Sequence, residues 1–357
     1  MSGGVDSSTT AALLVERGYN VIGLMMRLWS EGGDGDERFA SNRCCSPEAV
    51  ADARGVCQHL GIPFYLLNFE SEFKMHVVDF FLDGYARGVT PNPCLQCNRR
   101  VKFGALLDKA HTLGADYLAT GHYARVREHD GKFELLKGID PKKDQSYALY
   151  LLNQEQLSRA MFPLGEYAKE QTREMARRIG LRIAEKHESQ DLCFIADGEY
   201  RNFLRRHIPN SLSPGNIVDS RGNVVGRHEG LPFYTIGQRK GLGVAVGEPL
   251  YVIDLDAARN AVVVGRAEEL GKCELVATDV NWIDSSAPYS EIRVTAKIRY
   301  RAAEAPAIVQ ALSAGPKTGE RARVVFDQPL RDITPGQAVV FYNGEVCLGG
   351  GIIETSQ

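Results

Sequence analysis

The feature that most constrains this chain is a glycine- and serine-rich run at residues 2–8 (SGGVDSS), followed by an alanine- and leucine-rich stretch that predicts a helix over 9–17. Gly3 and Gly4 leave room for the backbone to wrap an anion, and the N-terminal N–H groups of the helix would point at the same place. The run therefore predicts a cradle for a pyrophosphate group. The alternative is a glycine-rich turn in which an Asp or Ser caps the helix. The run contains neither the Walker A pattern nor the dinucleotide-binding pattern G-x-G-x-x-G.

Helix-like and strand-like stretches alternate along the first half of the chain. Strands are predicted over 19–28, 63–68 and 115–120, and helices over 47–60, 73–85 and 102–113. This alternation is typical of α/β proteins, in which helices cover both faces of a parallel sheet. We therefore predict an α/β fold with a doubly wound, mostly parallel sheet.

The second half of the chain has a different composition, rich in glycine, proline and short runs of β-branched residues. Its first part predicts a small β-rich central domain. Beyond that part, alternating runs such as EIRVTAKIRYR and RARVVFD, separated by turn signals, predict a C-terminal antiparallel β-barrel. We expect three domains, at residues 1–198, 199–271 and 272–357.

Charge and cysteine content limit the classes of protein that this chain can be. Its 42 basic and 45 acidic residues leave a net charge of -3, so composition gives no sign of a polyanionic partner, and a nucleic-acid role would need local basic patches. Eight cysteines without a secretory segment favour a reducing cytosol, where disulfide frameworks are rare. No apolar run is long enough to cross a bilayer. We expect a soluble, cytoplasmic protein that does not contact a membrane.

Two of the cysteines, Cys94 and Cys97, lie in the polar loop TPNPCLQCNRR. Its prolines stiffen the loop, and Arg99 and Arg100 place positive charge next to the thiols, which lowers a thiol pKa and favours the reactive thiolate. The C-x-x-C spacing brings both sulfurs to one centre or within exchange distance. A packed core pair is the alternative, which the polar surroundings disfavour.

The other cysteines give weaker signals. Cys193, in the segment HESQDLCFI, is a lone cysteine of a kind that is more often packed in a core than catalytic. The neighbours Cys44 and Cys45 cannot readily share a bond. The remaining three lie in apolar patterns, and we predict that they pack in the core: Cys57, Cys273 and Cys347.

The full SGGVDSS string resembles the signature of ATP pyrophosphatases of the PP-loop superfamily, which split ATP between the α and β phosphates and adenylate a substrate. This resemblance implies ATP and Mg²⁺ as cofactors, with Asp6 helping to hold the metal. An adenylated carbonyl oxygen leaves as part of AMP, and a sulfur nucleophile can then replace it. An adenylating loop and reactive thiols in one chain therefore indicate thiolation.

Several motifs occur in the order found in the bacterial tRNA-specific 2-thiouridylases, which the chain resembles over nearly its whole length. The motifs are SGGVDSS, TPNPC-x-x-CN, ATGHYAR, KDQSYAL, ESQDLCFI, YTIGQRKGLG and RYR. The resemblance implies an adenine nucleotide alpha hydrolase-like domain, a small central domain and a tRNA-contacting barrel. It also implies an enzyme, a tRNA-uridine 2-sulfurtransferase that converts the wobble uridine to 2-thiouridine with release of AMP and pyrophosphate.

The same resemblance assigns roles to individual residues. The ATP site would comprise Ser2, Gly3, Gly4, Val5, Asp6, Ser7, Ser8, Met26 and Gly121. Cys97 would be the nucleophile, and Cys193 would carry sulfur as a persulfide received from a donor protein, after which the two cysteines would end as a disulfide. The target base would meet Asn92, Pro93 and Cys94. Further tRNA contacts would come from His122, Lys143, Asp144, Gln145, Arg299, Tyr300, Arg301 and Gln337.

Two features depart from the family pattern. Many members carry an aspartate at the position of Cys94. With a cysteine there, Cys94, Cys97 and Cys193 resemble the three cysteines that hold a [4Fe-4S] cluster in related thiolases, and a cluster-based reaction is the alternative to the persulfide. In addition, no strand is encoded before the glycine-rich loop. We expect that strand to lie upstream of Met1, and an N-terminally extended chain to fold or bind ATP better.

Two other classes of protein stay open. The first is another ATP-dependent ligase or amidotransferase with the same PP-loop, which would not need the C-x-x-C loop, the later cysteine or the barrel. The second is a non-enzymatic RNA-binding or metal-binding protein that uses the barrel and the three cysteines.

Overall fold

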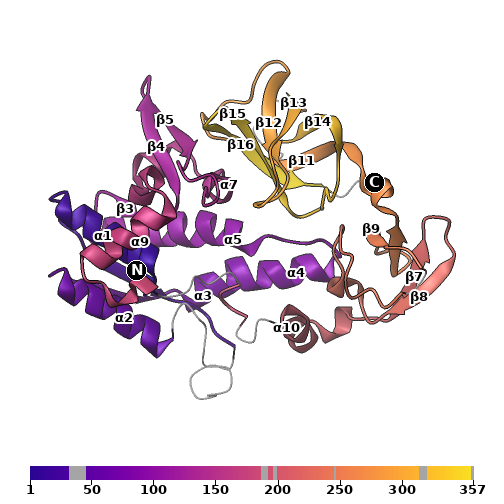
Figure 1. The fold of residues 1–357 in the computed structure, drawn as a ribbon, viewed down its shortest axis with the longest axis horizontal. Coiled ribbons are helices and arrows are strands. Elements are labelled where there is room, and N and C mark those ends of the chain that lie inside the picture. Colours follow the sequence, from indigo (N-terminus) through magenta and orange to yellow (C-terminus); the bar gives the residue numbers. More distant parts are fainter. Residues whose placement is uncertain (32–45, 186–191, 196–198, 245–246, 313–319, 355–357) are drawn as a thin grey trace.

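The computed structural model describes residues 1–31, 46–185, 192–195, 199–244, 247–312 and 320–354. Cys44 and Cys45 lie outside these ranges. The chain is arranged as an N-terminal α/β part, a four-stranded central sheet and a C-terminal barrel (Figure 1). Among the described helices, none is long and apolar enough to span a membrane.

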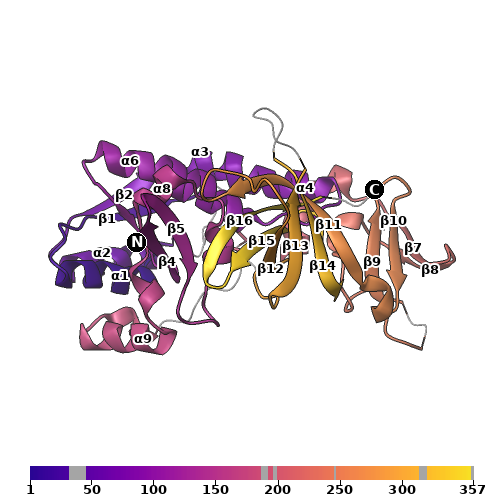
Figure 2. The same ribbon diagram turned by 90° about the horizontal axis from the view of Figure 1, so that it is seen from above.

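The N-terminal part begins with helix α1 (Val5–Glu16), strand β1 (Gly23–Arg27), helix α2 (Pro47–His59) and strand β2 (Phe64–Asn68). Strands β1 and β2 are parallel, and β3 (Leu118–Ala119) pairs in parallel with β6 (Ala160–Met161). Helix α6 lies on one side of β1 and β2, and α1 and α2 lie on the other (Figure 2). The predicted α/β fold with parallel strands is confirmed, as two parallel pairs within the described residues of the N-terminal part.

Two long helical segments extend from the α/β part beneath the barrel, toward the central sheet (Figure 1). The first consists of α3 (Glu70–Phe73), η1 (Lys74–Asp79) and α4 (Phe80–Ala86), and the second of α5 (Pro93–Gln96), η2 (Cys97–Leu106) and α6 (Leu107–Thr112). Gly104 breaks the helical geometry of the second segment, with φ -104° and ψ -105°. The second segment carries the C-x-x-C motif at its start.

A hairpin that the sequence analysis missed links the α/β part to the barrel. Strands β4 (Ala124–His129) and β5 (Lys132–Lys137) are antiparallel, and β5 pairs with β16 of the barrel. An ion pair of 2.6 Å between Arg125 and Glu345 supports this junction. The missed signal was Asp130-Gly131, both with positive φ, which is the residue pair favoured in tight hairpin turns.

The segment after the hairpin is mainly helical and leads to the central domain. It contains α7 (Ser146–Leu149), α8 (Gln154–Ser158), η3 (Pro163–Glu166), α9 (Lys169–Arg178), η4 (Arg182–Glu185), α10 (Tyr200–His207) and η5 (Pro209–Ser211). The central sheet has the order β8-β7-β10-β9. Its elements are β7 (Gly215–Asp219), β8 (Val224–His228), η6 (Leu231–Phe233), β9 (Tyr251–Asp256) and β10 (Ala261–Gly265), followed by η7 (Ala267–Leu270).

The C-terminal strands form the predicted antiparallel barrel. They are β11 (Lys272–Trp282), β12 (Ile292–Lys297), β13 (Ala305–Ala311), β14 (Ala322–Leu330), β15 (Ala338–Asn343) and β16 (Val346–Ile353). The order is β11-β14-β13-β12-β15-β16, and β11 also pairs with β16, which closes the barrel. Its interior is apolar, with Trp282 and Phe341 in ring contact at 5.5 Å.

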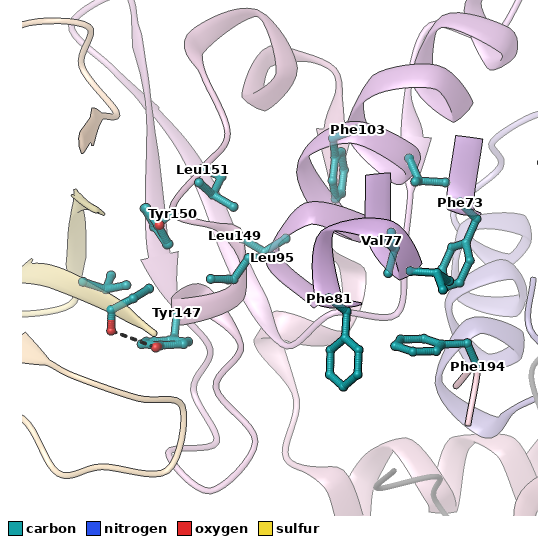
Figure 3. Packing of buried hydrophobic residues seen from close by; sticks show 14 of the residues in the cluster. Phe73, Val77, Phe81, Leu95, Phe103, Tyr147, Leu149, Tyr150, Leu151 and Phe194 are labelled. Atoms are coloured by element: carbon teal, nitrogen blue, oxygen red, sulfur yellow. Dashed lines mark hydrogen bonds between the residues drawn. The ribbon is translucent and has the colours of Figure 1, made fainter. Parts of the chain in front are cut away.

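The largest core cluster joins the long helices to the barrel (Figure 3). Phe81 and Phe194 pack edge to face at 5.3 Å, and the Tyr147 hydroxyl donates to the Ala338 carbonyl of β15 at 2.9 Å. This packing places the C-x-x-C segment between the α/β part and the barrel.

The predicted packing of three cysteines is correct for two of them. Cys57 and Cys347 are buried, whereas Cys273 is exposed, so its prediction is wrong. The reason is its place at the end of a strand, because Lys272, Cys273 and Glu274 at the start of β11 are all exposed, and the pairing of β11 with β14 shifts register there.

Candidate functional site

The SGGVDSS run forms a tight turn into α1. Gly3 has a φ of 66°, and a Cβ added there would lie 2.5 Å from the Ala49 carbonyl oxygen in α2, so this position requires glycine. The Ser2 N–H donates to Ser7 Oγ at 3.1 Å, which closes the turn. Gly4 is the N-cap, and no side chain caps this 12-residue helix. The N-terminus of α1 therefore retains backbone donors for an anion.

Three segments far apart in sequence meet at Asp6, in the first turn of α1. Tyr123 Oη donates to Asp6 Oδ1 at 2.9 Å, and Lys169 Nζ, at the start of α9, donates to the same oxygen at 2.7 Å. A Cβ added at Gly121 would lie 2.9 Å from Asp6 Cβ and 3.0 Å from Ser7 N. Glycine at 121 thus lets the segment after β3 lie directly against the phosphate loop.

The remaining predicted ATP residues lie around this loop. Val5 is buried beside Val56 and Leu181, and Ser8 Oγ donates to the Gly4 carbonyl at 2.9 Å. Met26 is half-buried in β1 and packs against the main core cluster. The structure therefore brings Gly121 to the loop, and it places Met26 on the neighbouring strand.

The C-x-x-C loop is anchored by side-chain hydrogen bonds. Asn92 caps α5 by accepting the Cys94 N–H at 3.2 Å, and the amide of Asn98 donates to the Ala148 carbonyl of α7 at 2.9 Å. Cys94 is exposed and Cys97 is half-buried, while Pro93 is buried. The two thiols therefore lie at the start of a helix whose position is set by α7.

The beginning of this loop is held by the other two domains. The Thr90 N–H donates to the Pro335 carbonyl at 3.1 Å, and Gln337 Nε2 donates to the Thr90 carbonyl at 2.8 Å. The hydroxyl of Thr90 also bonds that of Thr235 in the central domain at 3.4 Å. Gln337, predicted to contact tRNA, thus fixes the loop that carries the thiols.

Cys193 lies in a short described segment whose neighbours are firmly packed. Phe194 contacts Phe73 at 6.0 Å and Phe203 at 5.5 Å between ring centroids. Cys193 and Cys97 are both half-buried against the same core cluster. Among the residues with described positions, no three His, Cys, Asp or Glu side chains could share a metal ion. The three cysteines are therefore not arranged as a cluster site in this structure.

The predicted tRNA-contact loop has an internal scaffold. Asp144 is buried, and its carboxylate accepts the Gly138 N–H at 3.1 Å, the Ser146 N–H at 3.0 Å and the Ser146 hydroxyl at 2.9 Å. Gln145 bonds Tyr123 through its N–H and its side-chain oxygen. Asp144 and Gln145 therefore shape the loop, and Lys143 is half-buried at its surface.

The RYR motif lies where β12 ends. Arg299, Tyr300 and Arg301 are exposed, Arg299 pairs with Asp332 at 2.7 Å, and the Tyr300 ring lies 6.3 Å from that of Tyr147 in α7. Because α7 also contacts the thiol loop, the structure gathers the RYR motif, the 143–145 loop and the C-x-x-C loop at one junction.

His122, which was predicted to contact tRNA, is buried in this structure. A side chain that stacks on a base would have to be accessible. Its Nδ1 lies 2.7 Å from Thr120 Oγ1, and its ring contacts Phe103 and Phe162. Burial, and to a smaller degree the nearby Lys102 ammonium, lowers the pKa of His122 well below 6.5. The imidazole is therefore neutral in the folded protein near pH 7.

This pKa predicts a pH-dependent contribution to stability. Below pH 6.5 the unfolded chain takes up a proton at His122, whereas the folded chain does not. The contribution of neutral His122 to the free energy of unfolding is therefore complete above pH 6.5 and is lost as the pH falls. Between pH 7.5 and 5.5 the free energy of unfolding should fall by about 1 kcal/mol more in the wild type than in His122→Gln. Urea titrations at both pH values measure this difference. Exposed His111→Gln is the control, and identical profiles for wild type and His122→Gln would contradict the assignment.

Sequence reasoning missed two residues that contact Asp6 of the predicted ATP site. Tyr123 lies within the ATGHYAR motif, but nothing in the motif shows that its hydroxyl reaches Asp6. Lys169 carries no local signal, since it lies 163 residues from Asp6 along the chain. Only the packing of α9 against α1 brings the two charges together.

Comparison with known proteins covers nearly the whole chain. Residues 1–197 match the tRNA methyl transferase HUP domain, residues 201–266 the tRNA methyl transferase PRC-barrel domain, and residues 272–353 the aminomethyltransferase β-barrel domain. A Moorella thermoacetica protein named tRNA-specific 2-thiouridylase MnmA is 53% identical over 99% of this chain and 98% of its own. Proteins of that name from Carboxydothermus hydrogenoformans and Clostridium perfringens are 51% and 49% identical, over 99% of this chain and 96% and 97% of theirs. The chain therefore belongs to the family of tRNA-specific 2-thiouridylases.

Proposed function

We propose that the protein catalyses ATP-dependent 2-thiolation of the wobble uridine of tRNA, with release of AMP and pyrophosphate. The observation that carries this proposal is that about half of the residues are identical, over nearly the full length of the chain, to those of proteins named tRNA-specific 2-thiouridylase. The junction of the C-x-x-C loop, the 143–145 loop and the barrel supports it, because one substrate could contact all three.

The phosphate loop fits ATP. Positive φ at Gly3 and the close approach of Gly121 to Asp6 shape a tight backbone turn at the start of α1, where no side chain caps the helix, and such a helix start is suited to bind phosphate. Asp6 supplies a carboxylate beside this cradle, which is the ligand type that Mg²⁺ prefers. When bound, Mg²⁺ would neutralise charge on the phosphates. The loop residues would orient the α phosphate toward the uridine C2 oxygen, whose attack forms the adenylate and expels pyrophosphate.

Sulfur transfer would use the two half-buried cysteines. The terminal sulfur of a Cys193 persulfide, received from a donor protein, attacks C2, and AMP leaves with the former carbonyl oxygen. The Cys97 thiolate then attacks the Cys193 sulfur, which breaks the S–S bond, releases 2-thiouridine and leaves a Cys97–Cys193 disulfide. An external thiol reductant supplies two electrons to restore both thiols. Such a reductant is consistent with a reducing cytoplasm.

The cluster alternative has no comparable support. The described cysteines do not form a group that could share a metal ion, so we derive no step through an iron-sulfur cluster. Cys94 is instead exposed at the start of α5, where Asn92 holds its backbone. With Asn92 and Pro93 it would face the target base.

The tRNA would bind across the junction of the domains. The exposed Arg299 and Arg301, and Lys143 on the adjoining loop, supply local positive charge for phosphates, whatever the net charge of the chain. The uridine would have to leave its base stack to reach the thiols. The exposed ring of Tyr300, beside α7, could then stack on a displaced base.

The proposal is tested with unmodified tRNA, MgATP and a persulfide donor. We expect 2-thiouridine in the nucleosides by mass spectrometry, together with ATP–pyrophosphate exchange that requires tRNA. Exchange without tRNA would indicate a small-molecule ligase, and absence of exchange would indicate a binding protein. Either outcome contradicts the proposed function.

A further inference from the structure

Asp6 is held from one side only. The Tyr123 hydroxyl and the Lys169 ammonium both donate to Oδ1, at 2.9 Å and 2.7 Å. Within the described part of the chain, Oδ2 accepts no hydrogen bond. The Asp6 side chain is 33% exposed, whereas that of Lys169 is 7% exposed. One carboxylate oxygen is thus occupied by the protein, and the other remains for a ligand.

A buried ammonium requires compensation. Removing a charge from water is strongly unfavourable unless an opposite charge and hydrogen bonds replace the lost solvation. Asp6 supplies the charge for Lys169, and the Tyr123 ring lies 5.6 Å from Nζ, within range of a cation–π contact. The Asp6 carboxylate therefore offsets the Lys169 ammonium within a group of three side chains at the start of α1.

Both holding residues are fixed by the same surface segment. The Lys169 N–H donates to Asp140 Oδ2 at 3.1 Å, and Asp140 shapes the turn that begins the 140–145 segment. Tyr123 exchanges two hydrogen bonds with Gln145, at 2.8 Å and 2.9 Å. The backbones of Lys169 and Tyr123 are thus anchored without a ligand, so the two side chains hold Asp6 Oδ1 in a defined position.

We propose that Lys169 and Tyr123 are positioning residues of the ATP site, which hold Asp6 Oδ1 so that Oδ2 is left for the magnesium ion of MgATP. This inference rests on the proposed function only for the identity of the nucleotide. Lys169 acts through Asp6 and not as a phosphate ligand. Its contribution therefore depends on magnesium and on the Asp6 carboxylate.

Calorimetric titration of the full chain with ATP, in Mg²⁺ and in EDTA, tests this dependence. Lys169→Met should weaken MgATP binding about 10- to 100-fold, the range for loss of a charge-assisted hydrogen bond, and should change ATP binding in EDTA much less. Tyr123→Phe keeps the ring and should weaken MgATP binding about fivefold. Lys74→Met removes an exposed ion pair with Asp79 and should leave both affinities unchanged.

A double-mutant cycle separates positioning from a general structural role. In an Asp6→Asn background, Lys169→Met should cost less than about twofold further, because its partner is already lost. Additive losses, or equal losses with and without Mg²⁺, would overturn the inference. So would a wild type that does not bind MgATP. Because no tRNA is present, a protein that binds MgATP normally but makes no 2-thiouridine would contradict only the proposed function.

Discussion

Replacement of Cys193 by serine should abolish formation of 2-thiouridine while tRNA-dependent ATP–pyrophosphate exchange continues. In the proposed mechanism adenylation uses the loop at residues 2–8, whereas sulfur transfer needs a thiolate that can carry a sulfane sulfur, which a hydroxyl cannot do. The amount of 2-thiouridine should fall about 10³-fold or more, because removing one member of a catalytic group costs about as much as removing the whole group. Mass spectrometry of tRNA nucleosides and pyrophosphate exchange on the same samples measure the two steps.

Three matched variants accompany this experiment. Cys97→Ser should give the same loss, because the adduct on Cys193 could not be resolved. Cys273→Ser changes an exposed cysteine at the start of β11 and should have no effect. Cys94→Ala should retain thiolation, whereas its loss would favour a three-cysteine centre. Thiolation that persists in Cys193→Ser would remove this residue from the mechanism.

Replacement of Gly121 by alanine should have the second large effect, on nucleotide binding. The new Cβ would lie 2.9 Å from both the backbone carbon and Cβ of Asp6, and 3.0 Å from Ser7 N, so either the 120–123 segment or the phosphate loop must move. Overpacking of this kind costs about 1–3 kcal/mol, which corresponds to MgATP binding about 5- to 150-fold weaker. Titration calorimetry measures the change.

Gly55→Ala is the matched control for this variant. Gly55 lies inside α2, and nothing lies within 4 Å of a Cβ added there. The substitution should therefore leave MgATP binding unchanged and raise the free energy of unfolding by about 0.5–1 kcal/mol, since alanine is the better helix former. Unaltered nucleotide binding in Gly121→Ala would mean that the close approach at this position does not matter for the ATP site.

The local elements of the fold could be predicted because their signals lie within a few residues of each other. The strand expected at 63–68 is β2, at Phe64–Asn68, and the helix expected at 47–60 is α2. The first helix begins at Val5 and not at residue 9, because the glycine-rich run itself leads into it. The hairpin β4 and β5 was missed although Asp130-Gly131 marks its turn.

The candidate site was predictable only where a motif is continuous in sequence. The SGGVDSS and C-x-x-C segments were found in this way, and their roles stay predictions. The ion pair between Lys169 and Asp6 depends on the packing of two helices, which no local pattern encodes. Burial of Asp144 likewise depends on the fold of its loop. The exposure of Cys273 follows from the end of a barrel strand, which an apolar sequence pattern does not mark.

The pairing of β5 with β16 has a consequence for the order in which the protein can be completed. Arg125 and Glu345, which join across this junction, lie 220 residues apart, so a chain emerging N-terminus first from the ribosome exposes the edge of β5 until its last described strand, β16, has been made. Unpaired strand edges recruit other chains. Lys132, Glu134 and Lys137 place charge along β5, and charged side chains on a strand disfavour its pairing with the edge of another chain.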